Sequence, residues 1–200
     1  DSSFGLNGIQ TMDVGENEYS NSLVFHKNKI IVGGYQINNG FKDSFLVKLD
    51  NNGTLDTTFS SNGYSLNSFS DDNDSIEVIK VQSDDKIITY GNSYDTNESC
   101  ILVTRFDSNG TLDSSFGMAG HYKICNNYFI SSTPQSMVVQ DDDSILITAS
   151  KNNDSYVYKL TNDGQLDTSF GISGQVTLSL NENSNAKSID TDKNGNIYVA

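Results

Sequence analysis

The segment "DTDKNGNI" (residues 190–197) spaces its oxygen-bearing side chains like the first part of a calcium-binding loop. Asp190, Asp192 and Asn194 occupy alternate positions, and Gly195 follows at the point where such loops bend. The corresponding turns elsewhere in the chain read "FHKNKI", "QSDDKI" and "QDDDSI", and no helical pattern flanks them. An ordinary β-hairpin turn is therefore the favoured interpretation, with a calcium site as the alternative.

A second oxygen-rich segment reads "DDND" and offers the carboxylates of Asp71, Asp72 and Asp74 to a cation. Acidic residues are dispersed through several such polar turns, which is typical of a solvated surface. We therefore expect no cofactor, and Ca²⁺ is the ion for which the sequence offers ligands.

Cys100 and Cys125 are the only cysteines of the chain. If the segment ending at Phe106 pairs antiparallel with the segment that follows Gly120, residue 100 lies opposite about residue 126. This register predicts that the cysteines are neighbours. A disulfide would suit an exported protein, and two unpaired thiols are the alternative. Two cysteines without matching histidines do not make a structural zinc site.

The two histidines do not indicate catalysis. No Ser, Asp or Cys recurs around His26 or His121 in the arrangement of a nucleophilic enzyme. Phosphate-binding glycine loops and paired catalytic carboxylates are also unrecognisable. We expect turn or surface histidines, and a protein that is not an enzyme unless a larger parent protein carries the site.

A repeat organises the elements around these residues. The segments "DSSFG", "LDTTF", "LDSSFG" and "LDTSFG" place a Phe at intervals of 55, 57 and 54 residues, and a Gly follows four positions later. The repeated residues are Phe4, Phe59, Phe116 and Phe170, with Gly8, Gly63, Gly120 and Gly174. We expect each Phe to wedge between adjacent repeats. The Asp and Ser or Thr beside it are expected to hold the preceding turn through side-chain to backbone hydrogen bonds.

Each repeat contains four apolar segments separated by polar turns, which predicts four β-strands. Asn-Gly and Asp-Gly pairs in "DNNG", "DSNG" and "TNDG" tolerate the positive φ of tight reversals. Ile30, Ile31 and Val32 are apolar in consecutive positions, which indicates a sheet buried on both faces. A sandwich would need roughly seven strands per unit, and leucine-rich coils repeat about every 20 to 29 residues. The sequence therefore predicts an all-β propeller with four-stranded antiparallel blades of about 55 residues.

The order of motifs also carries a family resemblance. Leu-Asp-[Ser/Thr]-[Ser/Thr]-Phe-Gly-x-x-Gly, then "VQSDDKIITYG", then an apolar strand ending in Lys-Leu-Asp-x-Asn-Gly resembles the delta-60 repeat. This β-propeller family is found chiefly in large exported or surface proteins of bacteria. Ser60 and Thr161 depart from its pattern, where Gly and Asp are usual, and this affects local turn geometry. The resemblance implies a propeller, an extracellular or cell-surface location and no established general activity.

By analogy with NHL-type propellers, the strand before the polar turn is the innermost strand of each blade. We then expect an outer strand of a neighbouring or closing blade at 1–17, blades at 18–70, 71–130 and 131–182, and the first two strands of an incomplete blade at 183–200. These make about 3.5 repeats of a partial ring. Further blades of a parent chain, about 6 to 8 in total, or a second copy with composite blades would complete it.

Charge and composition restrict the partners. A formal charge of −14 disfavours nucleic acid and anionic lipid surfaces. No apolar run is long enough to span a bilayer, so membrane insertion is not expected.

We interpret the chain as a non-enzymatic scaffold or binding module of an exported or cell-surface bacterial protein, with protein or glycan as ligand. Loops at 34–43 and 91–100 carry Tyr35, Phe41 and Tyr94, which are candidates for a binding surface, and packing between the loops is the favoured alternative. Two alternatives remain. The chain could be part of a propeller enzyme, a hydrolase or lyase that acts on polysaccharide, or a module that self-assembles through open blade edges.

Overall fold

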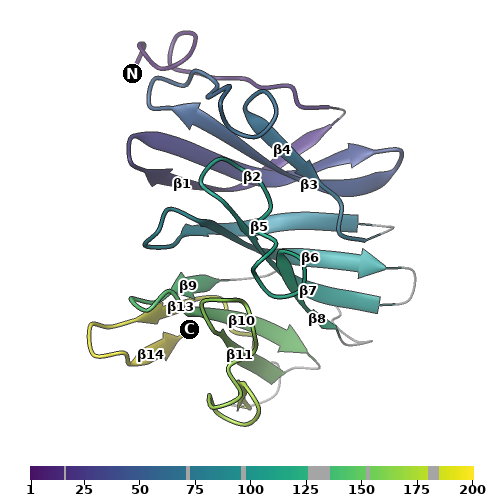
Figure 1. The fold of residues 1–200 in the computed structure, drawn as a ribbon, viewed down its shortest axis with the longest axis vertical. Helices are drawn as coiled ribbons and strands as arrows, with labels where there is room; N and C mark the ends of the chain where they lie inside the picture. The colour runs from purple at the N-terminus through teal and green to yellow at the C-terminus, as the bar shows by residue number, and fades with distance from the viewer. Residues whose placement is uncertain (16, 71–72, 96–97, 126–135, 152–153, 180–184) are drawn as a thin grey trace.

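The computed structural model describes residues 1–15, 17–70, 73–95, 98–125, 136–151, 154–179 and 185–200, whose strands form antiparallel sheets (Figure 1). Sheet 1 comprises β1 (Glu18–His26), β2 (Lys29–Asn38), β3 (Phe41–Asp50) and β4 (Tyr64–Asn67). Sheet 2 comprises β5 (Asn73–Val81), β6 (Ile87–Asp95), β7 (Glu98–Phe106) and β8 (His121–Cys125). Sheet 3 comprises β9 (Met137–Val139), β10 (Ile145–Lys151), β11 (Asp154–Leu160) and β12 (Gln175–Leu178). β13 (Ile189–Thr191) and β14 (Ile197–Val199) form a terminal hairpin.

In each four-stranded sheet, the strands lie side by side in the order in which the chain makes them. The prediction of an all-β chain with four-stranded antiparallel sheets is confirmed. The described residues contain no helix that is long and apolar enough to cross a membrane.

A tight hairpin turn replaces the loop that we expected at 34–43, and the described residues of 91–100 lie in strands. β2 and β3 pair without interruption up to Asn38 and Phe41, which leaves Asn39 and Gly40 as a two-residue turn. Both turn residues have positive φ, 51° and 88°, as hairpin turns that match the strand twist require. The expectation of a long loop at 34–43 is wrong, because continuing the ladder satisfies backbone groups that a loop would leave to water. Residues 91–95 and 98–100 also lie in strands.

Consecutive sheets pack face to face, one after another along the longest axis of the molecule (Figure 1). β1 contacts β5, β5 contacts β9, and β9 contacts β13, so the first strands of neighbouring sheets lie side by side. The innermost strands of propeller blades meet in this way around the central axis. The sheets do not close on themselves within the described residues, so the chain forms a partial ring.

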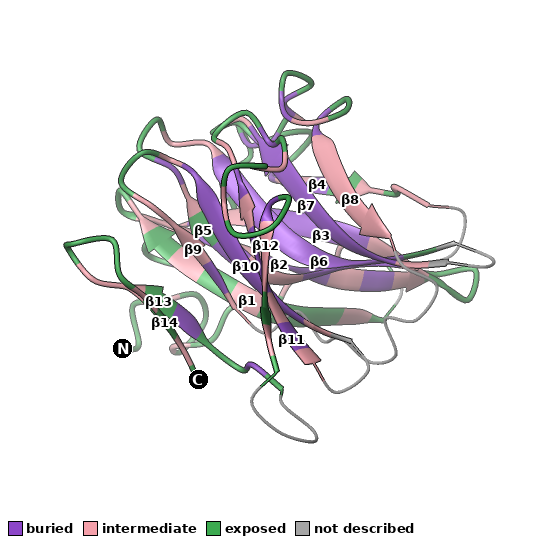
Figure 2. Ribbon diagram, turned by 90° about the horizontal axis from the view of Figure 1, so that it is seen from below, coloured by how far each residue is buried: buried purple, intermediate pink, exposed green. Residues whose placement is uncertain are grey.

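The core lies between the sheets, and the strands of sheet 2 contribute to both of its sides (Figure 2). Ile87 belongs to the cluster shared with sheet 1, which contains Ile31 and Leu46. Its neighbour Ile88 belongs to the cluster shared with sheet 3, which contains Ile145. Ile87 and Ile88 are both 0% exposed, so consecutive apolar residues are buried on opposite faces, as predicted. Each such side chain stabilises the packing of two sheets by about 1.5–3 kcal/mol.

Residues 1–15 form no strand, and their one ladder contact is a bridge between Leu6 and Ile9. Met12 and Val14 pack instead against Phe45 and its buried neighbours on the face of sheet 1 that points away from sheet 2. A strand needs a neighbouring backbone with which to pair. In the described structure these residues cover an apolar face rather than extend a sheet.

Candidate functional site

The repeated Leu-Asp-x-x-Phe segment forms a tight turn after the third strand of each sheet. In sheet 2, the Asp113 Oδ1 atom accepts hydrogen bonds from the backbone nitrogen of Ser115 at 3.0 Å and from its Oγ at 2.6 Å. Asp56 and Thr58 make the same pair of contacts in sheet 1. The bonds run forward to the Ser or Thr two positions on, as in an Asx turn. The expectation that they hold the preceding turn is therefore wrong.

A glycine four residues after the Phe closes this turn. The Gly120 nitrogen donates to the Phe116 oxygen at 2.8 Å, with φ of +97°. A Cβ at position 120 would lie 2.5 Å from Cγ of Leu112, so a side chain here would be strained and would also clash. The same backbone bond recurs at Gly8, Gly63 and Gly174.

The Phe of the turn wedges between two sheets. Phe116 is 0% exposed and belongs to the cluster between sheets 2 and 3. Its ring lies against Gly164, in the turn that follows β11 of the next sheet. Phe59 contacts Gly110 and Phe4 contacts Gly53 in the same way. Phe170 is only partly buried and packs beside the terminal hairpin.

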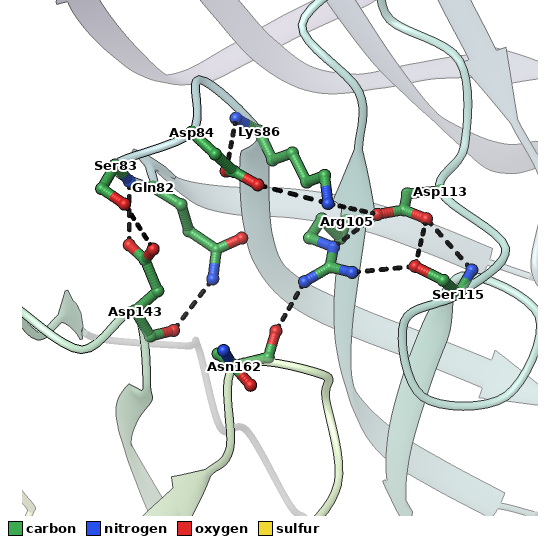
Figure 3. A network of polar contacts seen from close by, with 9 residues as sticks. All are labelled: Gln82, Ser83, Asp84, Lys86, Arg105, Asp113, Ser115, Asp143 and Asn162. Atoms are coloured by element: carbon green, nitrogen blue, oxygen red, sulfur yellow. Dashed lines mark hydrogen bonds and ion pairs between the residues drawn. The ribbon is translucent and has the colours of Figure 1, made fainter.

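Arg105, at the end of β7, adds a polar connection between sheets 2 and 3 beside this wedge (Figure 3). Its Nε donates to Asp113 Oδ2 at 2.7 Å, its Nη2 to Ser115 Oγ at 3.1 Å, and its Nη1 to the backbone oxygen of Asn162 at 2.5 Å. The guanidinium lies 4.8 Å from the Phe116 ring centroid, and Arg105 is only 6% exposed. The fork geometry of arginine thus satisfies a buried carboxylate and a carbonyl of the next sheet together.

The protonation of the site is set by these contacts. Burial raises the pKa of Asp113, but the Ser115 hydrogen bonds and the charges of Arg105 and Lys86 outweigh burial and lower the pKa to about 2. Lys86 Nζ lies 3.2 Å from Asp84 and 3.4 Å from Asp113. The hydrogen bond to Asp84 raises the pKa of Lys86 above its ordinary value. Asp113 and Lys86 are consequently both ionised near neutral pH.

A groove of about 290 Å³ opens beside this network. It is lined by Gln82, Asp84, Lys86, Arg105, Ser115, Asp143, Asn162 and Asp163. Gln82 is 3% exposed and donates from Nε2 to the backbone oxygen of Asp143 at 2.9 Å. Its Oε1 has no hydrogen-bond partner and points toward the side of the groove where Arg105 lies (Figure 3).

A related groove of about 420 Å³ lies between sheet 3 and the terminal hairpin. Gln140, Asp142 and Lys159 line it at positions that match Gln82, Asp84 and Arg105 of the preceding repeat. Thr191, Asp192 and Lys193 form part of its other side. The grooves are therefore a product of the repeat.

A comparison with protein families agrees with this geometry. Residues 28–59, 82–116 and 140–170 match the family described as "Domain of unknown function (DUF5122) beta-propeller". The chain belongs to a β-propeller-type repeat family. The crystal structure of Sqt1 from Chaetomium thermophilum is similar with a TM-score of 0.44 and 14% identity, over 90% of this chain and 40% of that one. No curated protein matches the chain. Sheets 1, 2 and 3 are called blades 1, 2 and 3 below.

The calcium candidates have different surroundings in this propeller. Asp192 Oδ1 accepts from the backbone nitrogens of Asn194 and Asn196 at 2.8 and 2.9 Å, so its carboxylate braces the β13–β14 turn. Hydrogen bonds from Asn196 lower the pKa of Asp192 to about 2. Asp190 is exposed and bonds the next backbone nitrogen. Among the described residues, no group of three His, Cys, Asp or Glu side chains is placed to hold a metal.

In the second acidic segment, Asp74 is buried in the described structure, with 1% of its surface exposed. Asp71 and Asp72 lie outside the described residues.

Cys100 and Cys125 are opposite each other on β7 and β8 and form a disulfide, with Cα atoms 4.1 Å apart. The histidines lie at junctions between blades or on sheet faces. His26 Nε2 is 2.7 Å from Asp85 Oδ1 of blade 2. His121 lies on β8, where burial lowers its pKa.

The three aromatic candidates for a binding surface are not brought together. The cross-strand register places Tyr35 and Phe41 on opposite faces of blade 1, and Tyr94 lies in blade 2. Tyr35 stacks on Tyr19 with ring centroids 5.0 Å apart, and Lys42 Nζ lies 4.1 Å from the Tyr35 centroid. Tyr35 therefore belongs to a cross-strand aromatic pair, while Phe41 and Tyr94 are 45% and 37% exposed.

Our sequence reasoning missed the ion pairs of the junction, although a signal for them exists. A basic residue stands eight positions before the aspartate of the turn in each repeat: Lys48 before Asp56, Arg105 before Asp113, and Lys159 before Asp167. The backbone nitrogen of each aspartate donates to the oxygen of that basic residue at 2.8–2.9 Å. The recurrence of opposite charges at one spacing could have predicted the ion pairs of Asp113 and Asp167, whereas Asp56 pairs with Lys29 instead.

Proposed function

We propose that the chain is a non-enzymatic binding and scaffold module of an exported or cell-surface bacterial protein, with protein or glycan as ligand. The observation that carries this proposal is that the charged side chains of the groove are engaged in contacts within the protein itself. Asp113 holds Arg105, which joins blade 2 to blade 3 through the backbone oxygen of Asn162, and Lys86 belongs to the same network. The resemblance to delta-60 repeats supports the exported setting.

The protonation of the network favours recognition over proton transfer. A general acid or base works best when its pKa lies near the operating pH. Asp113 has a pKa of about 2, and the pKa of Lys86 is raised above its ordinary value. At neutral pH neither group is poised to exchange a proton with a substrate.

The groove still offers hydrogen-bond acceptors to a ligand. Gln82 Oε1 has no partner, and Asp84 and Asp163 line the opening. Asp84 is accessible, since its side chain is 51% exposed. Acceptors of this kind suit sugar hydroxyls or the amide and amino groups of a protein.

A glycan array probed with the 200-residue chain and with an Asp84→Ala, Asp163→Ala variant tests the proposal. We expect retention on at least one glycan class to fall about tenfold in the variant, and Asp190→Ala, an exposed change outside the groove, to retain full binding. The same samples are incubated with polysaccharides and assayed for new reducing ends. Hydrolysis that is abolished by one Asp or Glu substitution would overturn the proposal in favour of a propeller enzyme.

An exposed apolar face supports pairing with another blade as a second role. Ile79, Met137 and Ile189 occupy matching positions on the first strands of their sheets and are 3%, 1% and 4% exposed. Their counterpart on β1, Leu23, is 66% exposed. In the described structure, the face of blade 1 that carries Leu23 is not covered by a neighbouring blade, unlike the equivalent faces of the other sheets. Another blade, from a parent chain or a second copy, would cover it.

Light scattering distinguishes the sources of that blade. Association of the chain that Leu23→Lys prevents would support a second copy, and a strict monomer at high concentration would exclude it. A parent chain would then be the remaining source of the additional blade. Binding of the preceding repeat of that chain, produced separately, would test it.

A further inference from the structure

Asp74 is a buried carboxylate in the interface between blades 1 and 2. It stands two positions before Ile76 on the same face of β5, and Ile76 belongs to the cluster that joins the two blades. Asp74 Oδ2 accepts hydrogen bonds from the backbone nitrogens of Phe69 at 2.5 Å and Ser70 at 2.9 Å. Asp74 Oδ1 is buried and has no hydrogen-bond partner. Half of a fully buried carboxylate is therefore unsatisfied.

Two hydroxyl oxygens near this carboxylate are also unsatisfied. Ser93 lies directly opposite Asp74 in the register of β5 and β6 and is 1% exposed, and its Oγ has no partner. Directly opposite residues have Cβ atoms about 4.5–5.5 Å apart. Ser70, whose backbone nitrogen bonds the carboxylate, also has a buried Oγ without a partner.

The charge of Asp74 has no counter-charge in contact with it. Within the described residues, Asp74 takes part in none of the ion pairs. Lys123, a cation on the same face of blade 2, donates to the backbone oxygen of Phe69 at 2.7 Å instead. A buried charge is normally paired with an opposite charge or coordinates a metal ion, because an isolated one is costly to remove from water.

We propose that Asp74, with the hydroxyl oxygens of Ser93 and Ser70, holds a small cation between blades 1 and 2. Carboxylate and hydroxyl oxygens are ligands for hard cations. The single carboxylate balances one positive charge, so Na⁺ matches the site in charge, and Ca²⁺ is the divalent ion of the same ligand chemistry. The proposal is independent of the groove between blades 2 and 3.

Thermal unfolding of the whole chain in different salts tests this proposal. The chain is melted in choline chloride, NaCl and CaCl₂ at matched ionic strength, because choline is too large for a buried site. We expect Na⁺ or Ca²⁺ to raise the Tm by at least about 3 °C over choline. The salt that raises the Tm identifies the ion.

Asp74→Asn is the decisive variant. Its carbonyl oxygen can still accept from the Phe69 and Ser70 nitrogens, while its NH₂ group replaces Oδ1 and places a donor where the cation is proposed. We expect this variant to lose the difference between salts. Ser93→Ala should increase the salt concentration that is needed to raise the Tm. This second variant keeps the test valid if Asp74→Asn fails to fold. Asp13→Asn, a change at an exposed carboxylate, should respond to salt as the unchanged chain does.

Equal Tm values of the unchanged chain in all three salts would overturn the proposal, as would a salt effect that survives in Asp74→Asn. A higher Tm for Asp74→Asn than for the unchanged chain in every salt would also contradict it. That result would mean that the carboxylate is buried without a counter-ion and that water alone fills the space.

Discussion

The ring of Phe116 occupies the space that a side chain at position 164 would need. A Cβ built on Gly164 would lie 2.7 Å from three carbon atoms of that ring, although the two residues belong to different blades. Gly164 also has a φ of +81°, which L-residues with side chains rarely adopt. One glycine thus serves both the turn of blade 3 and its contact with blade 2.

Gly164→Ala should destabilise the chain by about 2–4 kcal/mol, because strain at positive φ and overpacking against Phe116 add. Gly40→Ala is the matched control, with φ of +88° and no atom within 4 Å of the new Cβ. It should cost about 1–2 kcal/mol. Urea unfolding of both variants measures the difference, and equal losses would show that the wedge contact is unimportant.

Truncating the wedge itself should have a larger effect. Phe116→Ala is expected to lower the free energy of unfolding by about 3–5 kcal/mol, because the ring is 0% exposed between two blades. Phe170→Ala removes the equivalent, partly buried ring and should cost less than half as much. Denaturant midpoints decide this, and a greater loss for Phe170→Ala would contradict the assignment.

The disulfide should stabilise blade 2 by restricting the unfolded chain. Cys100 and Cys125 are separated by 25 residues, and closing a loop of this size contributes about 2–4 kcal/mol. The Cys100→Ala, Cys125→Ala chain should unfold at correspondingly lower urea concentration and be insensitive to reductant. In denaturant without reductant, the natural chain should take up no iodoacetamide, and a mass increase of two adducts would refute the bond.

Acid should weaken the junction between blades 2 and 3. The pKa of Asp113 falls from 3.8 to about 2 on folding, so its stabilisation is present above pH 3.8 and is lost as the pH falls through about 2. The shift corresponds to about 2 kcal/mol. Asp113→Asn should flatten the pH dependence of stability between these values, and Asp141→Asn, an exposed change, should leave it unchanged. A curve of unaltered slope for Asp113→Asn would exclude the ion pair.

The fold was accessible from the sequence because local chemistry specifies it. Asn-Gly turns and consecutive apolar pairs such as Ile87 and Ile88 predict short strands that are buried on both faces. Antiparallel register counted from Gly120 placed residue 100 opposite about 126, and its partner in the structure is Cys125. We expected a loop to begin at Gly34, but β2 and β3 remain paired beyond it. A glycine does not end a strand when its backbone groups and those of its neighbours can still form hydrogen bonds with the adjacent strand.

The contacts of the junction between blades 2 and 3 were harder to predict from the sequence, because they join residues of different blades. The partner of Arg105 in blade 3 is a backbone oxygen, and any residue at position 162 could supply it. The unsatisfied oxygens of Asp74 and Ser93 likewise depend on how blade 1 covers blade 2, which no local pattern encodes. Periodicity predicts which residues face inward, whereas polar partners across an interface depend on the packing itself.

The most direct test of the account is the titration of the Asp113 carboxyl, followed by carbon-13 NMR in the folded chain. The central claim is that the charges of the groove are fixed in ion pairs within blade 2, whose Arg105 also bonds blade 3, so that the site binds and does not transfer protons. The account predicts a pKa of about 2 for Asp113. A pKa of about 5 or higher, in the range that a general acid or base requires, would contradict it.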